Sequence, residues 1–230
     1  MTPAIVYRTA HVFGVAAILV VILWMQTDAK GFDYHTEPKL RFKFHPILMS
    51  AGLLFLNGEA VMSFRALKAY PRYLVKALHA SLHAASVGVT LAVRDASQFD
   101  STAINRQSVH AWIGTILSSV YAFLWVASMF LFYFPLTPGH VRATALPYHR
   151  LSGIFGFSLA AINVALGVLE RLKWGNDCNS TVVCTEDWLV NVFGIFVGVY
   201  VTCVLIILLR PGWSTKILAK KPLINERKEQ

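Results

Sequence analysis

Residues 188–209 read WLVNVFGIFVGVYVTCVLIILL, without a single charged side chain. An α-helix rises about 1.5 Å per residue, so a run of this length crosses the roughly 30 Å of hydrocarbon in a bilayer. A β-barrel strand needs only about 9–11 residues and alternates in polarity, whereas this run is continuously apolar. We therefore predict a transmembrane helix over this stretch.

Further apolar runs of helical length precede it, and short polar connections separate them. Their limits are 5–26, 45–64, 73–93, 109–134 and 148–169. The first run is expected to be an uncleaved span, because no small-x-small cleavage site follows it. The sequence thus predicts an all-α integral membrane protein of six transmembrane helices, with one membrane domain over 1–230 and a basic tail at 210–230.

Composition supports a membrane protein. Hydrophobic residues make up 56% of the 230 residues and charged residues 14%, against roughly 45–50% and about 25% in soluble domains. The net charge of +9 would suggest nucleic acid for a soluble protein, but no basic stretch is interleaved with aromatic residues. We therefore expect a lipid bilayer as the partner, and no nucleic acid.

The distribution of charge predicts how the spans are oriented. Alternate connections divide the Lys and Arg residues into 13 on the side of the N-terminus and 8 on the other side. The Asp and Glu residues of the connections lie mostly on that other side. Since basic residues are retained in the cytosol, both termini are predicted to be cytosolic.

The connection 170–187 is thereby placed outside the cytosol, and it carries features that such a compartment permits. It contains Cys178 and Cys184, a candidate disulfide, and the sequon at Asn179, a candidate glycosylation site. Disulfides and N-glycans both form in lumenal or extracellular compartments. Their position agrees with the orientation that the charges predict.

Histidines occur in or at the ends of four spans, where ionisable residues are costly and point to function. With alternating spans, His45 and His110 are expected near the outer face, and His83 and His149 near the inner face. The separations within the two hairpins are nearly equal, 38 and 39 residues. His79 lies one turn from His83 on the same face, and on spacing alone it is an equal candidate.

Two histidines at each of two levels, in a central bundle formed by the second to fifth spans, favour two haem groups with axial imidazoles. Zinc requires three or four protein ligands at each level, and no Asp, Glu or Cys accompanies these pairs. Glu59 in the second span is either a hydrogen-bonded packing residue or part of a proton relay. His11, His35 and His140 are expected to be solvated, in or near connections.

Several motifs within residues 40–210 resemble those of the cytochrome b561 family. They are FHPILM at 44–49, NGEA at 57–60, LHA at 82–84, VHAWIG at 109–114, LPYH at 146–149 and NVALGVLE at 163–170. The resemblance implies a dihaem protein that passes electrons across a membrane. It also implies that the second histidine of the H-x-x-x-H-A stretch, His83, is the ligand, and that two b haems are held by His45 with His110 and by His83 with His149.

The family resemblance further implies cytosolic ascorbate as the electron donor and monodehydroascorbate or a ferric chelate as the outer acceptor. Lys76 matches a family lysine of the inner substrate site, and other basic residues on that side are candidates for the same site: Lys68, Arg72 and Arg150. Arg150 is also a candidate partner for a haem propionate. Asn105 matches an outer-site residue, although QSVH at 107–110 departs from the family's Tyr-Ser-Leu-His.

The resemblance also implies a protein of an endomembrane, of vacuolar or lysosomal type, or of the plasma membrane, and a candidate homodimer. Two functions of other classes are compatible with the residues alone. One is a haem-free transporter of metal ions or protons that uses the intramembrane histidines and Glu59. The other is a structural or assembly subunit without chemistry of its own.

Overall fold

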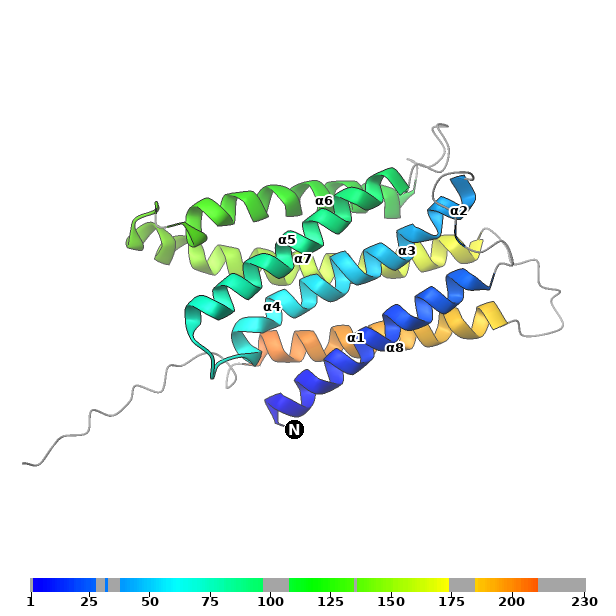
Figure 1. Cartoon of the computed structure of the whole chain (residues 1–230), viewed down its shortest axis with the longest axis horizontal. Helices are drawn as coiled ribbons and strands as arrows, with labels where there is room; N and C mark the ends of the chain where they lie inside the picture. The colour runs from blue at the N-terminus through cyan, green and yellow to red at the C-terminus, as the bar shows by residue number, and fades with distance from the viewer. Residues whose placement is uncertain are drawn as a thin grey trace, which may run out of the picture.

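A computed structural model describes residues 2–27, 32, 38–96, 108–134, 136–173 and 185–210. Within those ranges, six helices are long and apolar enough to cross a membrane, and they lie roughly side by side (Figure 1). They cover Pro3–Gln26, Leu40–Ala66, Arg72–Val93, Val109–Tyr133, Gly139–Leu172 and Thr185–Leu209. The predicted all-α, six-span architecture is confirmed.

Two of the spans are composite helices. The elements of the chain are α1 (Pro3–Gln26), α2 (Pro38–Phe42), α3 (Phe44–Met49), the π-helix η1 (Ser50–Leu56), α4 (Asn57–Ala66), α5 (Arg72–Ala96), α6 (Val109–Ser128), the π-helix η3 (Met129–Tyr133), α7 (Gly139–Lys173) and α8 (Thr185–Leu209). The second span therefore runs from α2 to α4, and the fourth consists of α6 and η3.

The fifth span begins nine residues earlier than the sequence predicts, at Gly139 instead of residue 148. Pro147 lies inside α7, directly before the predicted start of the span. Proline removes one backbone hydrogen bond and kinks a helix without always ending it. His140 is consequently in the first turn of α7 instead of a connection.

The spans alternate in direction, so the start of α1 and the end of α8 share one side of the molecule, which we call the N-terminal side. On this side the guanidinium of Arg65, at the end of α4, donates to the carbonyl of Ile207 at 2.9 Å. The ammonium of Lys76 in α5 donates to the carbonyl of Tyr133 at 3.3 Å. These bonds join the cytosol-predicted ends of four spans.

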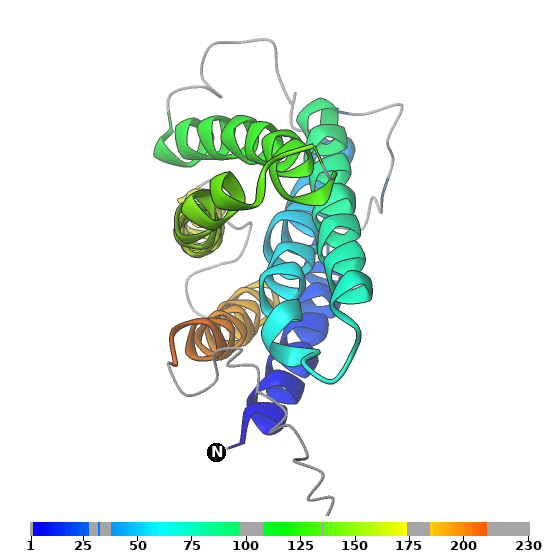
Figure 2. The same ribbon diagram turned by 90° about the vertical axis from the view of Figure 1, so that its left-hand side faces the viewer.

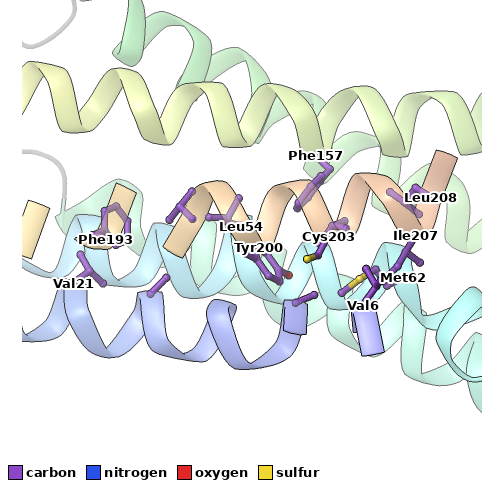
Figure 3. Packing of buried hydrophobic residues seen from close by; sticks show 14 of the residues in the cluster. Val6, Val21, Leu54, Met62, Phe157, Phe193, Tyr200, Cys203, Ile207 and Leu208 are labelled. Atoms are coloured by element: carbon purple, nitrogen blue, oxygen red, sulfur yellow. The ribbon is translucent and has the colours of Figure 1, made fainter. Parts of the chain in front are cut away.

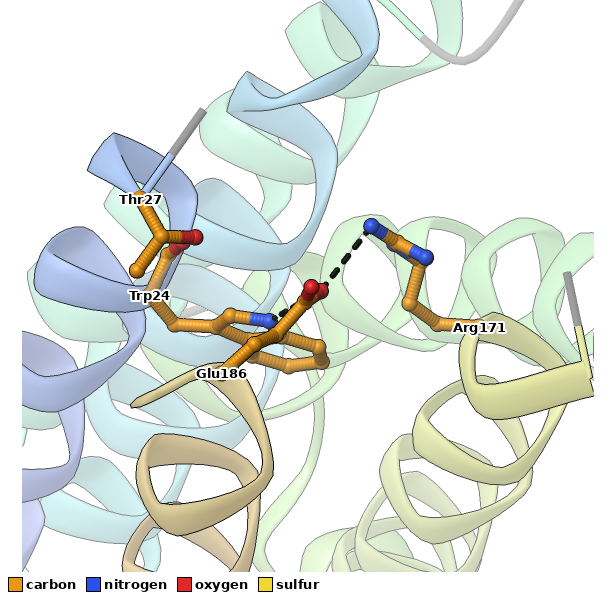
Figure 4. Close-up of polar contacts among 4 residues, drawn as sticks. All are labelled: Trp24, Thr27, Arg171 and Glu186. Atoms are coloured by element: carbon orange, nitrogen blue, oxygen red, sulfur yellow. Dashed lines mark hydrogen bonds and ion pairs between the residues drawn. The ribbon is translucent and has the colours of Figure 1, made fainter. Parts of the chain in front are cut away.

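On the opposite side, a polar contact joins three helices (Figure 4). The carboxylate of Glu186 in α8 accepts from the indole N–H of Trp24 in α1 at 3.0 Å and from the guanidinium of Arg171 in α7 at 2.9 Å. Because Trp24 and Arg171 share one carboxylate, the ends of α1, α7 and α8 on this opposite side are held together.

The most extensive packing joins α1 and α8, which lie side by side in both ribbon views (Figures 1 and 2). The buried face of α1 carries small residues, Ala10, Gly14 and Ala17, and large side chains of α8 such as Phe193 and Tyr200 pack in the same cluster (Figure 3). Helices in lipid associate through such close packing of small residues, because lipid supplies no hydrophobic drive.

The π-helix η1 lies in the middle of the second span, where its widened turn offers carbonyl groups to neighbouring helices. The hydroxyl of Tyr200 in α8 donates to the carbonyl of Phe55 at 2.9 Å, and the hydroxyl of Ser86 in α5 donates to that of Gly52 at 2.8 Å. An unsatisfied carbonyl is costly in a membrane. These two hydroxyls therefore stabilise a helix irregularity at the centre of the bundle.

Candidate cofactor site

Two pairs of histidines face each other from four different spans. Near the opposite side, His45 of α3 and His110 of α6 have ring centres 5.9 Å apart and planes at 77°. Near the N-terminal side, His79 of α5 and His149 of α7 have ring centres 6.1 Å apart and planes at 69°. The two pairs are therefore almost alike in separation and angle.

This separation suits a metal ion between two imidazoles. A metal–imidazole bond is about 2 Å long and the ring centre lies about 1 Å beyond the nitrogen, so two axial rings have centres about 6 Å apart. No cluster of three or more His, Cys, Asp or Glu that could hold a metal ion occurs in the part of the chain that the structure describes. The pairs thus fit a cofactor that supplies the other ligands itself, as haem does.

The N-terminal-side pair contains His79 and not His83, which our sequence analysis assigned as the ligand. The ring of His83 instead contacts that of His79 edge-on at 4.5 Å, and its Nδ1 lies 2.6 Å from the hydroxyl of Tyr121. The geometry favours His79. The assignment of His83 came from the family resemblance, whereas the spacing along the chain had left both histidines of α5 as candidates.

Hydrogen bonds orient two of the paired rings. The Nδ1 of His110 lies 2.8 Å from the carbonyl oxygen of Asn163 in α7, and the Nδ1 of His79 lies 2.8 Å from that of Ala60 in α4. A carbonyl only accepts, so Nδ1–H is the donor and Nε2 keeps its lone pair free. Metal-binding histidines typically make this bond, because it fixes both the tautomer and the ring.

The other two rings are oriented differently. The Nδ1 of His149 lies 3.3 Å from the hydroxyl of Ser128 in α6. The Nδ1 of His45 is buried and has no hydrogen-bond partner among the described residues, while the ring stacks on Phe42 at an angle of 6°. A buried imidazole nitrogen without a partner is costly in an apolar bundle unless it binds something there.

Local sequence explains the position of His110. The side chain of Ser108 accepts from the backbone N–H of Ala111 and so caps the start of α6. His110 lies in this capped first turn. Gly167 of α7 permits the close approach of the ring, because a Cβ there would lie 2.7 Å from a carbon of the imidazole. The NVALG segment at 163–167 therefore supplies both the carbonyl and the space that His110 needs.

The two histidine levels lie about 20 Å apart along the helices. His45 and Ala60 are separated by 15 residues of the second span, and His110 and Trp125 by 15 residues of α6. At 1.5 Å per residue both stretches measure about 22 Å. Trp125 donates to the carbonyl of Ala80, next to His79, at 3.4 Å, so both helices give the same separation.

The basic residues predicted for a substrate site lie at the N-terminal side. Lys76 places its ammonium 5.4 Å from the ring centre of Tyr133, and Arg150 follows His149 directly. Arg72, Lys68 and Arg150 are exposed. Arg65, which was not among the predicted substrate residues, interacts electrostatically with Arg150. The positive charge near the His79–His149 pair is thus larger than expected.

The structure also changes the interpretation of His11. We expected it to be solvated in or near a connection, but it lies inside α1 and its Nδ1 is 3.5 Å from Oε1 of Glu59. The predicted outer residues Asn105, Cys178, Asn179 and Cys184 lie outside the described residues, so they remain predictions.

Comparison with known proteins agrees with this arrangement. The chain is 28% identical to a Caenorhabditis elegans homologue of a transmembrane ascorbate-dependent reductase, over 94% of this chain and 86% of that protein. It is 32% identical to transmembrane ascorbate ferrireductase 1 of Arabidopsis thaliana, over 82% and 83%. It is 31% identical to ascorbate-specific transmembrane electron transporter 1 of Zea mays, over 88% and 87%. A model of eukaryotic cytochrome b561 matches residues 44–175, and the chain therefore belongs to the cytochrome b561 family.

Proposed function

We propose that this protein is a transmembrane oxidoreductase that carries electrons from ascorbate across the bilayer through two b-type haems. Membership of a cytochrome b family implies b-type haem, and relatives are named for ascorbate-dependent reduction or electron transport. The observation that carries the proposal is the presence of two histidine pairs with ring centres 5.9 and 6.1 Å apart.

The residues of each pair have defined tasks. His45 with His110 and His79 with His149 would each hold one haem through ring nitrogens, and the carbonyls of Asn163 and Ala60 hold Nδ1–H of one ring in each pair and so leave its Nε2 free. A haem with two imidazole ligands supplies a one-electron couple and leaves no open position for oxygen. A cytochrome also fits these pairs better than a haem-free transporter or an assembly subunit.

Ascorbate is an anion, so we assign its site to the basic N-terminal side of the molecule, near the His79–His149 pair. Lys76 is the best candidate because its ammonium already lies beside Tyr133 at the end of the fourth span. Arg72, Lys68 and Arg150 add a positive field that attracts an anion. Arg150 also lies where it can pair with a haem propionate.

Electrons then leave the protein on the opposite side. We infer that the acceptor there is monodehydroascorbate or a ferric chelate, with Asn105 in its site, and that the connection containing Cys178, Asn179 and Cys184 faces the same compartment. Positive charge on the N-terminal side supports cytosolic termini. An endomembrane or the plasma membrane fits this orientation, and a homodimer is compatible with it.

Oriented proteoliposomes test the function. Haem-loaded protein is inserted with its N-terminal side outward, ferric citrate is trapped inside, and ascorbate is added outside. We expect the haem absorption band to become reduced and internal Fe²⁺ to accumulate. His79→Ala should abolish transfer, whereas Arg171→Gln, at the outer ends of the helices, should retain it. Absence of an ascorbate-reducible haem band in the unmodified protein would overturn the proposal.

A further inference from the structure

A carboxylate that the histidine pairs do not use is buried in the second span. Glu59 of α4 is 8% exposed. The hydroxyl of Tyr7 in α1 donates to its Oε2 at 3.3 Å, and the Nδ1 of His11 lies 3.5 Å from its Oε1. Oε1 itself is buried and accepts no hydrogen bond from the described residues. A carboxyl group at this depth is costly and therefore suggests a function.

Glu59 is closely connected to the N-terminal-side histidine pair. The next residue, Ala60, provides the carbonyl that accepts from Nδ1 of His79. Glu59 points instead toward α1 and α8, where the titratable groups that face it are Tyr7, His11 and Tyr200. One peptide unit thus separates a buried carboxyl group from the hydrogen-bond partner of a paired histidine.

His11 is the imidazole that lies beside this carboxyl group. Its side chain is 54% exposed, and it lies eight residues from the first residue of α1, about 12 Å along the helix. An imidazole accepts a proton on one nitrogen and releases one from the other, which makes histidine a proton shuttle. The ring contacts Phe55 at 5.7 Å between centres, so it is held beside Glu59 by packing.

We propose that Glu59 binds one proton each time the haem that the N-terminal-side histidine pair would hold receives one electron. The carboxylate takes up the proton from the medium on the N-terminal side, with the adjacent His11 as the proton carrier, and becomes a neutral carboxylic acid. When the electron moves on, the acid returns the proton by the same route. Negative charge added in a medium of low dielectric constant favours neutralisation of a nearby carboxylate. This inference rests on the proposed function, since the proton accompanies the electron.

Infrared difference spectroscopy tests the proton site directly. Haem-loaded protein in nanodiscs is reduced electrochemically, without ascorbate, and the reduced-minus-oxidised spectrum is recorded in H₂O and D₂O. We expect the carbonyl stretch of a protonated carboxyl group on reduction, with a downshift in D₂O. Glu59→Gln should remove the band, and Tyr7→Phe should shift it because the hydrogen bond to Oε2 is lost.

Glu170→Gln is the matched control, because it removes another buried carboxyl oxygen and should leave the band in place. A second readout is the midpoint potential against pH. Linked uptake of one proton lowers it as pH rises, by up to about 59 mV for each tenfold fall in proton concentration, and Glu59→Gln should flatten this slope.

The outcomes separate the two proposals. A haem that ascorbate reduces, with no carboxyl band and no pH slope in the unmodified protein, overturns the proton site alone. A band that persists in Glu59→Gln overturns it as well. A protein without reducible haem overturns the proposed function instead. If Glu59→Gln fails to fold, the carboxyl band in Tyr7→Phe tests the proton site, and a band that does not shift overturns it.

Discussion

The imidazole of His110 is held against Gly167, where a Cβ would lie 2.7 Å from the ring. The same ring places Nδ1 2.8 Å from the carbonyl of Asn163, one turn earlier in α7. α7 therefore determines how the α6 histidine is oriented, although it contributes its own histidine, His149, to the other pair. Each pair thus depends on a helix that carries no ligand for it.

Gly167→Ala should displace the ring of His110 and weaken binding of one haem. The added methyl group has no space unless the ring or the helix shifts, so we expect about half of the haem content and an altered spectrum. Gly194→Ala is the control, because a Cβ at that position meets nothing within 4 Å. Haem per chain, measured as the pyridine complex, distinguishes the two. Equal haem contents would show that the contact does not matter.

Replacement of the two neighbouring histidines of α5 should have opposite effects. His79→Ala removes the ring that lies 6.1 Å from His149, and we expect the loss of one of two haems. His83→Ala removes the bond to Tyr121 and should retain both haems. The measurement is the haem-to-protein ratio of each purified variant. The reverse pattern would restore His83 as the ligand.

Lys76→Gln should weaken ascorbate binding more than it slows electron transfer. Removal of one positive charge near an anion site raises KM, and the effect should shrink as salt screens the remaining charges. Initial rates of haem reduction by ascorbate at low and high ionic strength measure this, with dithionite as a reductant that needs no such site. Arg142→Gln is the control for simple loss of charge. An unchanged KM would remove Lys76 from the site.

Glu186→Gln should loosen the outer ends of three helices. The change weakens the pairing with Arg171 and the bond from Trp24, and loss of a hydrogen bond to a charged group costs about 1.5–3 kcal/mol. We expect a lower Tm for the variant in detergent. A double-mutant cycle with Arg171→Gln gives the pairwise energy. A coupling energy of zero would mean that the ion pair is only a geometric contact.

Tyr200→Phe should destabilise the π-helix η1 without touching the histidines. The hydroxyl that donates to the carbonyl of Phe55 is lost, and a hydrogen bond of this kind contributes about 0.5–1.5 kcal/mol to stability. Thermal unfolding should begin earlier while haem content stays the same. Tyr121→Phe, which also removes a hydroxyl, contacts His83 instead and provides the comparison. Unchanged stability of Tyr200→Phe would indicate that a water molecule replaces the hydroxyl.

The span count was predictable because hydropathy and length determine which segments cross a bilayer, and the alternation in direction follows from that count. The early start of α7 was not, since Pro147 is compatible both with a helix boundary and with a kinked helix. Pairing of His45 with His110 followed from the direction of the spans alone. This prediction required only that each histidine be assigned to one side of the membrane.

The choice between His79 and His83 depended on information that spacing does not contain. Both lie on one face of α5, and they differ in which neighbour accepts the Nδ1 proton: the carbonyl of Ala60 or the hydroxyl of Tyr121. The contact of His11 with Glu59 was missed for a similar reason. The two residues lie in different spans, and only the packing of α1 against α4 brings them together.

The packing of α1 against α8 constrains how the protein is made. α1 leaves the ribosome before the other described helices, whereas α8, which covers its seam of small residues, leaves after them. Until α8 is inserted, the hydroxyl of Tyr7, which is the polar group of α1 closest to Glu59, has lipid or the insertion machinery on one side. Chains truncated before residue 185 should therefore be recognised by cellular quality control, even though the four spans that carry the paired histidines are complete.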